Sequence, residues 1–280
     1  MQPDEIAARI WPGRAIELEP LGGGITNRNF KVSLDGEVFV MRIGGKDTDL
    51  LGIDRRAEYA ASVMAAELGV GPEVVGFVEP EGFLVTRFIE GSAVPPTELS
   101  IGEVAHTLVL VHGGRSLPSR FDAFRVVEVY RSTAEQHGVR IPAAYGEAKA
   151  RADAIEASLP RQPLRPCHND LLNANFIDDG ERLRLVDWEY AGMGDPFFDL
   201  ANFAANHSLD DSRERELLTE YLGDVRDSDL GRLREMRVMS DFREAMWGVV
   251  QQGISDLDFD FAAYADEHFE RALTYAASLD

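Results

Sequence analysis

The chain has 280 residues, and 45% of them are hydrophobic, which is enough for a packed core in one large or two modest domains. Its formal net charge of −21 at pH 7 argues against a nucleic-acid-binding protein, because that class needs a basic surface. An acidic surface maintains solubility and is compatible with a cationic substrate.

Few features bear on the compartment. Cys167 is the single cysteine of the sequence, so no internal disulfide can form, and a reducing compartment suits the chain. Residues 1–5 lack the basic start and apolar core of a signal peptide. No apolar run approaches the roughly 20 residues that cross a bilayer. We therefore expect a cytoplasmic protein that binds neither membranes nor nucleic acid.

A glycine-rich segment over residues 21–30 is predicted to form a turn between two strands. Glycines let the backbone approach a ligand closely, and unpaired N–H groups in such a turn can hold phosphate oxygens. An ordinary hairpin turn has a similar composition, and the segment lacks the Gly-Lys-Ser/Thr of a P-loop. Upstream of the acidic motif described below, it is a candidate lid over a nucleotide. The candidate phosphate-binding residues are Gly22, Gly23, Gly24, Thr26 and Asn27.

The next two elements bring one basic and one acidic residue within reach of each other. Residues 38–43 follow a tight-turn signal and form a predicted strand whose basic residue is Arg42. Residues 54–68 form a predicted amphipathic helix that places Glu58 one turn in, able to face Arg42. A solvated strand edge for Arg42 and a surface position for Glu58 are the alternatives.

Two more predicted strands, over residues 74–78 and 83–88, precede a break at residues 92–96, Ser-Ala-Val-Pro-Pro. Beyond this break the chain is mainly helical, and helices are predicted over residues 98–112, 121–137 and 145–159. We therefore place a boundary near residue 90. It separates an N-terminal domain of residues 1–90 from a C-terminal domain of residues 91–280.

The stretch from residue 168 to residue 199 carries the strongest chemical signal, because it contains Asp170, Asn175 and Asp187 in close succession. A short hairpin predicted over residues 176–186 folds Asp187 back beside Asn175. Such a set can supply a base and two oxygen ligands for Mg²⁺, the groups that phosphoryl transfer from ATP to a hydroxyl needs. Asp and Asn are also common in loops, where they bond their own backbone, so each residue alone has a structural explanation.

A helix start follows at Asp195-Pro196, with an acidic N-cap and a proline at the first helical position. The predicted helix runs through Phe203. Asp195 therefore has a capping role, whereas Asp199 lies inside the helix and needs another explanation.

The pattern His-x-Asp-x-x-x-x-Asn at residues 168–175, followed by Asp-Trp-Glu-Tyr-Ala-Gly-x-Gly-Asp-Pro-x-x-Asp-Leu-Ala at residues 187–201, resembles the aminoglycoside phosphotransferase and choline kinase superfamily. The resemblance covers most of the chain and is densest between residues 166 and 206. It implies an α+β, bilobal protein-kinase-like fold. A small antiparallel β-sheet with one main helix would form the N-lobe, a larger helical part the C-lobe, and ATP and Mg²⁺ would be the cofactors.

The resemblance implies a role for each matching position of the catalytic segment. Asp170 corresponds to the catalytic base, and Asn175 and Asp187 correspond to the metal ligands. His168 belongs to the same catalytic set as the scaffold residue that shapes the loop. Asp199 would hold the backbone of that loop from below.

The nucleotide side follows from the same resemblance. Arg42 takes the place of the phosphate-binding lysine of protein kinases, as arginine does in choline kinases, and Glu58 would orient it. Backbone groups of the hinge near Phe88 and Ile89 would bond the edge of the adenine.

The acceptor side rests on residues 243–255, which resemble the choline-kinase segment that contributes an aromatic wall to the choline pocket. Trp247 would be the wall residue, because a trimethylammonium group favours aromatic faces. Animal choline kinases have a second tryptophan where this chain has Glu244, whose carboxylate can still neutralise a cation. A position in the plain helix core is the alternative for Trp247. Besides Asp170, the other expected substrate neighbours are Tyr190, Phe203 and Phe242.

Together these features predict a small-molecule kinase that transfers the γ-phosphate of ATP to the hydroxyl of a small cationic alcohol. Choline and ethanolamine are the leading candidates for that alcohol. A thiamine-type or aminoglycoside-type phosphotransferase of the same fold, or a non-catalytic nucleotide-binding homologue, is the alternative. We expect a monomer or homodimer whose partner is a small-molecule alcohol.

Overall fold

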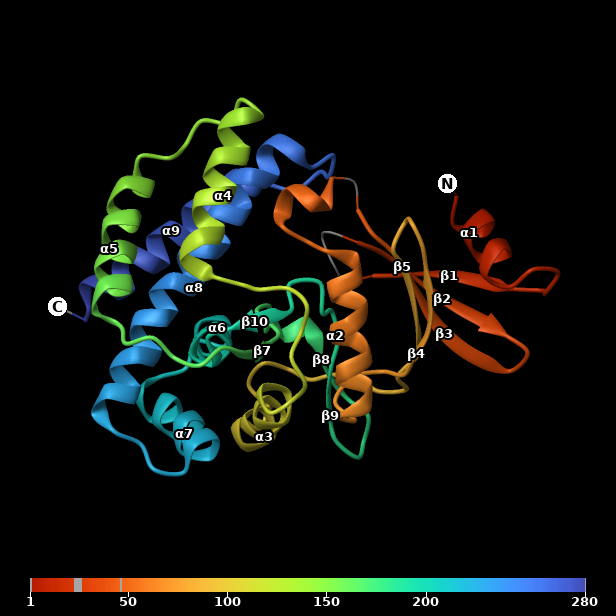
Figure 1. The fold of residues 1–280 in the computed structure, drawn as a ribbon, viewed down its shortest axis with the longest axis horizontal. Helices are drawn as coiled ribbons and strands as arrows, with labels where there is room; N and C mark the ends of the chain where they lie inside the picture. The colour runs from red at the N-terminus through yellow and green to blue at the C-terminus, as the bar shows by residue number, and fades with distance from the viewer. Residues whose placement is uncertain (1, 23–26, 46, 280) are drawn as a thin grey trace.

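The structure is a computed structural model that describes residues 2–22, 27–45 and 47–279. An antiparallel sheet lies at one end of the molecule and a bundle of helices at the other (Figure 1). The predictions for Gly23, Gly24 and Thr26 lie outside the described residues. Within these ranges, none of the helices combines the length and the apolar character needed to cross a membrane.

The N-terminal part is built on a five-stranded antiparallel sheet with the strand order β1-β2-β3-β5-β4. Because side chains alternate along a strand, one face of β2 and β3 buries Val32, Phe39 and Met41, which pack with Ile6 of α1. The strands are β1 (Glu17–Leu21), β2 (Arg28–Leu34), β3 (Glu37–Ile43), β4 (Val74–Val78) and β5 (Phe83–Arg87). The helical elements are α1 (Pro3–Ile10), η1 (Thr48–Leu51) and α2 (Arg55–Glu67).

Helix α2 lies between the sheet and the C-terminal helices (Figure 1). Asp54 caps it by accepting hydrogen bonds from the backbone N–H groups of Arg56 and Ala57. The side chains of Ala61 and Met64 belong to the same hydrophobic core as the C-terminal helices. The main helix of the N-terminal part is therefore anchored in the C-terminal part, and the domain boundary near residue 90 stays a prediction.

The C-terminal part is arranged around the long helix α8, which packs against α4, α6 and α9. Its helices are α3 (Ile101–His112), α4 (Ala123–Gln136), α5 (Ala144–Ser158), α6 (Pro196–Asn206), α7 (Asp211–Leu222), α8 (Asp227–Ile254) and α9 (Phe261–Ala277). Two small sheets lie between this bundle and the N-terminal part, in the orders β10-β7 and β6-β8-β9. Their elements are β6 (Ser92–Ala93), β7 (Arg165–Cys167), η2 (Asn173–Asn175), β8 (Phe176–Asp178), β9 (Leu183–Leu185) and β10 (Gly192–Gly194).

The predicted α+β architecture, a small antiparallel sheet followed by a larger helical part, is confirmed by this arrangement. The helices expected from residues 98 and 121 begin later, at Ile101 and Ala123, because Ser100 and Asp122 are their N-caps. The hairpin between Asn175 and Asp187 forms as strands β8 and β9. It places the two halves of the acidic motif side by side, next to the sheet.

Candidate active site

The loop between β7 and β8, residues 168–175, is held from below by Asp199 in the first turn of α6. The carboxylate of Asp199 accepts hydrogen bonds from the backbone N–H groups of His168 (2.8 Å) and Asn169 (2.7 Å). It also contacts Nε2 of His112 at 3.0 Å, and Asp199 itself is fully buried. The carboxylate inside α6 thus satisfies donors of the loop, which is the contact that the resemblance implies.

His168 shapes the loop from inside. Its Nδ1 accepts from the backbone N–H of Asp170 (3.2 Å), and its Nε2 lies 3.0 Å from the carbonyl oxygen of Val186. Burial lowers the pKa of His168, so the ring is neutral and Nε2 carries the proton that is donated to Val186. The side chain has no exposed surface and does not line the cavity described below. We therefore treat His168 as a positioning residue and not as one that touches substrate.

We expect Asp199→Asn to destabilise the protein by about 2–4 kcal/mol and to lower kcat at least about tenfold. The amide would point its own N–H groups at one of the backbone donors of the loop, which would displace Asp170. Urea unfolding and steady-state rates measure the two effects. Asp210→Asn is the matched control, because Asp210 is the exposed N-cap of α7 and asparagine caps equally well. Unchanged stability and rate in Asp199→Asn would contradict the bracing role.

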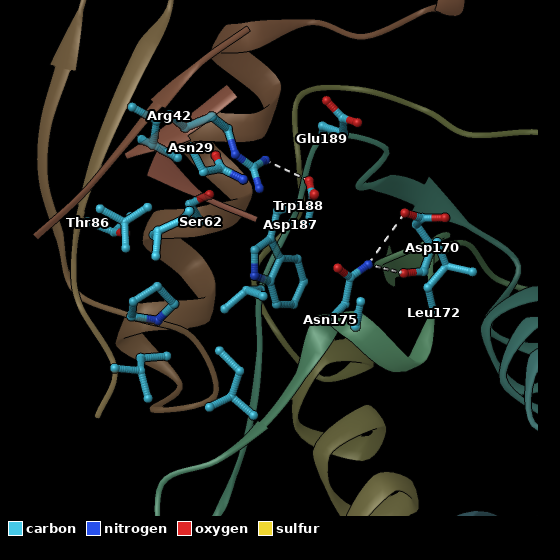
Figure 2. A pocket seen from close by; sticks show the side chains of 18 of the residues that line it. Asn29, Arg42, Ser62, Thr86, Asp170, Leu172, Asn175, Asp187, Trp188 and Glu189 are labelled. Carbon is cyan, nitrogen blue, oxygen red and sulfur yellow. Dashed lines mark hydrogen bonds and ion pairs between the residues drawn. The ribbon is translucent and has the colours of Figure 1, made fainter. Parts of the chain in front are cut away.

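Asp170 and Asn175 are joined within the loop. The amide Nδ2 of Asn175 donates to the backbone oxygen of Asp170 at 2.8 Å and to its carboxylate at 3.4 Å. Figure 2 shows that this contact turns the amide nitrogen toward Asp170 and the amide oxygen away from it. Burial raises the pKa of Asp170 to about 8; Arg243 opposes the shift, and Glu244 adds to it. A carboxylate with a raised pKa next to a cavity is suited to proton transfer.

Asp187 follows β9 and has a left-handed backbone conformation, with φ of +71°. The backbone N–H of Val186 donates to the carbonyl oxygen of Asn175, so the hairpin keeps positions 175 and 187 adjacent. The side chain of Asp187 is 18% exposed, and its Oδ1 accepts from Nη1 of Arg42 at 2.6 Å. One accessible carboxylate and one amide oxygen that points away from Asp170 fit a hard cation, so Asn175 and Asp187 could hold Mg²⁺.

Arg42 on β3 connects this site to the N-terminal part. Its Nη1 also contacts Oε1 of Glu58 at 2.8 Å, and Glu58 is buried on α2. Burial alone would lower the pKa of Arg42, but the carboxylates of Asp187 and Glu58 raise it. Arg42 is therefore a permanent cation at the wall of the cavity, oriented by Glu58.

A second guanidinium was not expected from the sequence. Nη1 of Arg55 contacts the carboxylates of Glu58 (2.7 Å) and Glu189 (3.2 Å), and its Nη2 contacts the side-chain oxygen of Asn27 (3.1 Å). Asn27 in turn donates to Glu189 at 2.8 Å. Burial raises the pKa of Glu189 to about 7, Asp187 adds to the shift and Arg42 opposes it. This network ties the end of the glycine-rich segment to the acidic motif, so Asn27 has a structural contact here and no place in the cavity wall.

A cavity of about 530 Å³ runs between the sheet and the C-terminal part. At the end next to the five-stranded sheet lie Gly22, Phe88 and Ile89, together with Arg42, whereas Glu58 contacts Arg42 and does not line the cavity. Asp170, Asn175 and Asp187 lie in its middle. The far end is formed by Tyr190, Arg243, Glu244, Trp247 and Tyr264.

The far end combines aromatic and charged groups. Nε1 of Trp247 donates to the hydroxyl of Tyr190 at 3.0 Å, and Tyr264 donates its hydroxyl to Glu244 at 2.9 Å. Arg243 forms an ion pair with Glu244. Neither Arg243 nor Tyr264 was expected from the sequence, although Arg243 stands directly before Glu244 in the segment that resembles choline kinases.

Two predicted substrate neighbours are wrong. Phe203 is fully buried and packs edge-on against Phe176, and Phe242 is fully buried between Tyr145 and Phe269. Both lie on faces of α6 and α8 that are turned to the helical core. Asp195, in contrast, has the capping contact that was expected, to the backbone N–H of Phe197 at 3.0 Å.

Comparison with known sequences places the chain in a family. A profile described as "Phosphotransferase enzyme family" matches residues 17–236. The protein LicA of Haemophilus influenzae is 31% identical over 71% of this chain, and the aligned part spans 61% of LicA. Ethanolamine kinase 2 of Mus musculus is 22% identical over 93% of this chain and 76% of its own length.

Solved structures show the same fold. A choline/ethanolamine kinase family protein from Mesorhizobium loti is 31% identical, with a TM-score of 0.82 and coverage of 100% of this chain and 99% of that one. The choline kinase LicA from Streptococcus pneumoniae is 24% identical, with a TM-score of 0.84 and coverage of 98% and 97%. A structure of LicA in complex with AMP is also 24% identical, with a TM-score of 0.83 and coverage of 99% and 97%. The chain therefore belongs to the phosphotransferase enzyme family and is a homologue of choline and ethanolamine kinases.

Proposed function

We propose that this protein transfers the γ-phosphoryl group of ATP to the hydroxyl of a small amino alcohol, choline or ethanolamine, with Mg²⁺ as cofactor. The observation that carries the proposal is the arrangement of Asp170, Asn175 and Asp187 in the middle of one cavity. Nucleotide and acceptor can then meet there from opposite ends. Phosphoryl transfer requires just such a combination of positioning and charge neutralisation.

The nucleotide end of the cavity supports ATP as the donor. Apolar side chains of Leu84, Ile89 and Ile177 line it, and they suit the faces of an adenine ring. The AMP complex of the homologous LicA supports a nucleotide in this fold. We propose that the hinge at Phe88 and Ile89 holds the base, and that Arg42 holds phosphate oxygens after leaving Asp187.

In the reaction, Asp170 would orient the acceptor hydroxyl and accept its proton as the acceptor oxygen bonds to the γ-phosphorus. The bond from that phosphorus to the bridging oxygen of ATP would break, and ADP would leave. The raised pKa of Asp170 makes the ionised carboxylate a stronger base than that of an ordinary aspartate. Asn175 and Asp187 would hold Mg²⁺, which when bound neutralises charge on the phosphate oxygens. Asp199 and His168 would keep Asp170 in place throughout.

The acceptor end supports an amine-bearing alcohol. Glu244 lies in this end and Asp170 borders it, both as buried carboxyl groups, and the guanidinium of Arg243 contacts both of them. The indole of Trp247 and the ring of Tyr264 add aromatic surface. A cationic acceptor would favour the ionised form of Asp170 beside the Arg243–Glu244 pair, which a neutral sugar alcohol would not do.

An acceptor panel tests the proposal. ADP release is measured with choline, ethanolamine, thiamine and an aminoglycoside, and ³¹P NMR identifies the product. We expect ADP in step with phosphocholine or phosphoethanolamine. Release with thiamine or the aminoglycoside alone would overturn the acceptor assignment. Saturable binding of Mg-ATP without turnover on any acceptor would favour a non-catalytic homologue.

We expect Arg42→Met to raise the KM for ATP about 10–100-fold, because a charge-assisted contact to phosphate is lost. Arg42→Lys keeps the charge but not the planar fork, so its KM should rise less. Initial rates against ATP concentration give both values. Arg56→Met is the control, since Arg56 directly follows Arg55 on α2, forms an exposed ion pair with Glu79 and does not line the cavity. An unchanged KM in Arg42→Met would remove Arg42 from the nucleotide site.

A further inference from the structure

Arg243 on α8 is a fully buried arginine at the acceptor end, with a side chain that is 1% exposed. Its guanidinium carbon lies 4.4 Å from the centre of the Tyr190 ring, in a cation–π contact. Its Nη1 pairs with the carboxylate of Glu244 and lies 3.5 Å from that of Asp170. Its Nε and Nη2 have no hydrogen-bond partner among the residues that the structure describes.

Packing alone does not account for this arginine. A buried guanidinium with two unpaired nitrogens destabilises a fold, and an apolar side chain of similar volume would fill the space without that cost. Arg232, three turns earlier on α8, differs from Arg243 at its terminal nitrogens. Its Nε, like that of Arg243, has no partner among the described residues, but both of its terminal nitrogens are engaged, by Asp195 and by the carbonyl oxygen of Pro160. The placement of Arg243 therefore calls for an explanation in the acceptor site.

The guanidinium of Arg243 stands where a substrate cation would otherwise bind. It covers the face of Tyr190, the kind of surface on which a trimethylammonium group is stabilised. It also engages one oxygen of Glu244, whose other oxygen accepts from Tyr264. Trp247 is held by Tyr190 and meets Tyr264 edge to face, so a complete aromatic box is not available.

A primary ammonium group has a different requirement. It offers three N–H donors and can be held by carboxylate and hydroxyl oxygens without an aromatic face. The carboxylate of Glu244 and the hydroxyl of Tyr264 are such acceptors in this end of the cavity, and the carboxyl oxygens of Asp170 border it. Replacing each N–H by a methyl group removes one of these bonds and adds bulk beside the guanidinium.

We infer that Arg243 is a specificity-determining residue that makes the acceptor site select a primary amino alcohol over a quaternary one. This inference rests on the proposed function and deepens it. It predicts that the wild-type protein prefers ethanolamine-like acceptors and that the guanidinium of Arg243 makes choline a poor substrate.

The wild-type protein tests the inference with a graded series of acceptors: ethanolamine, N-methylethanolamine, N,N-dimethylethanolamine and choline. We expect kcat/KM, measured by ADP release, to fall along the series, with at least about a tenfold difference between its ends. Choline equal to or better than ethanolamine would overturn the inference and leave the amino-alcohol kinase assignment intact. Turnover on none of the four would instead overturn the proposed function, and the inference with it.

Two variants then test Arg243 itself. In Arg243→Met, which uncovers the Tyr190 face, the ratio of kcat/KM for choline to that for ethanolamine should rise at least about tenfold. Arg243→Lys keeps a positive charge there and should shift the ratio less. If a folded Arg243→Met kept the wild-type ratio of kcat/KM for choline to that for ethanolamine, Arg243 would not determine specificity. Because the wild-type series needs no variant, the preference is decided even where Arg243→Met does not fold.

Discussion

Asp170→Asn is expected to lower kcat by about 10²–10⁴-fold and, at the same time, to stabilise the folded protein at alkaline pH. The loss of activity follows because an amide cannot accept the proton of the acceptor hydroxyl. The backbone should be retained, since the new side chain has the same shape. Asn175 can still donate to its oxygen and to the backbone oxygen of residue 170.

The gain in stability follows from the raised pKa of Asp170. Burial raises it from the ordinary 3.8 to about 8, with Glu244 and Asp187 adding to the shift and Arg243 opposing it. Between these values the folded protein holds a proton that the unfolded chain has lost, so the free energy of unfolding falls as pH rises from about 4 to about 8. Asparagine has no proton to lose, so that part of the decrease is absent.

Urea unfolding at pH 6 and pH 8, without Mg²⁺ or nucleotide, measures the effect. At pH 8 we expect Asp170→Asn to be more stable than wild type by about 1–3 kcal/mol, and at pH 6 the difference should be smaller. Asp266→Asn, an exposed position on α9, is the control for the same chemical change. Turnover near the wild-type rate would refute the catalytic role. Lost turnover combined with lower stability at pH 8 would refute only the electrostatic explanation.

The sequence predicts the catalytic segment well because the relevant geometry is local. Asp170, Asn175 and Asp187 lie in one loop and the hairpin that follows it, so turn and strand signals suffice to bring them together. Arg42 and Glu58 are separated by 16 residues. The strand and helix patterns place Glu58 within reach of Arg42, and the family resemblance implies the pairing that forms.

The residues that sequence reasoning missed are held by contacts between distant segments. Arg55, which was not predicted, reaches Glu189 across 134 residues, and the predicted candidate Asn27 makes an unexpected contact to Glu189 across 162. The residue pattern of neither segment predicts a contact with the other. Arg55 is followed directly by the exposed Arg56, and an arginine pair at a helix start has the composition of a solvated surface.

Helical periodicity fails for a related reason at Phe203 and Phe242. Both α6 and α8 are buried over most of their circumference, so an aromatic residue on either helix can face the cavity or the core. The tertiary arrangement decides between them. Trp247, five residues after Phe242, faces the cavity and lies near Tyr190, whereas Phe242 faces Tyr145.

Asp187→Asn is the second substitution with a large expected effect, because it removes the charged ligand of the proposed Mg²⁺ site. The left-handed backbone at residue 187 tolerates asparagine, so the hairpin should keep its shape. The amide oxygen can still accept from Arg42, whose Nη1 lies 2.6 Å from the present carboxylate. The change therefore affects charge at the site more than structure, and Asp187→Ala would add a backbone cost of about 1–2 kcal/mol.

We expect kcat/KM of Asp187→Asn to fall at least about a hundredfold at the Mg²⁺ concentration that saturates the wild type. Raising Mg²⁺ should recover part of the loss, because a weakened site fills by mass action. Rates measured across a Mg²⁺ titration separate affinity from the limiting rate. Asp179→Asn is the matched control: Asp179 lies in the turn of the same hairpin, bonds Arg184 and the turn backbone, and does not line the cavity. Its Mg²⁺ dependence should be that of the wild type even where its stability falls. If Asp187→Asn also kept the wild-type Mg²⁺ dependence, other groups would have to bind the cation. The role of Asp187 would then be limited to its ion pair with Arg42.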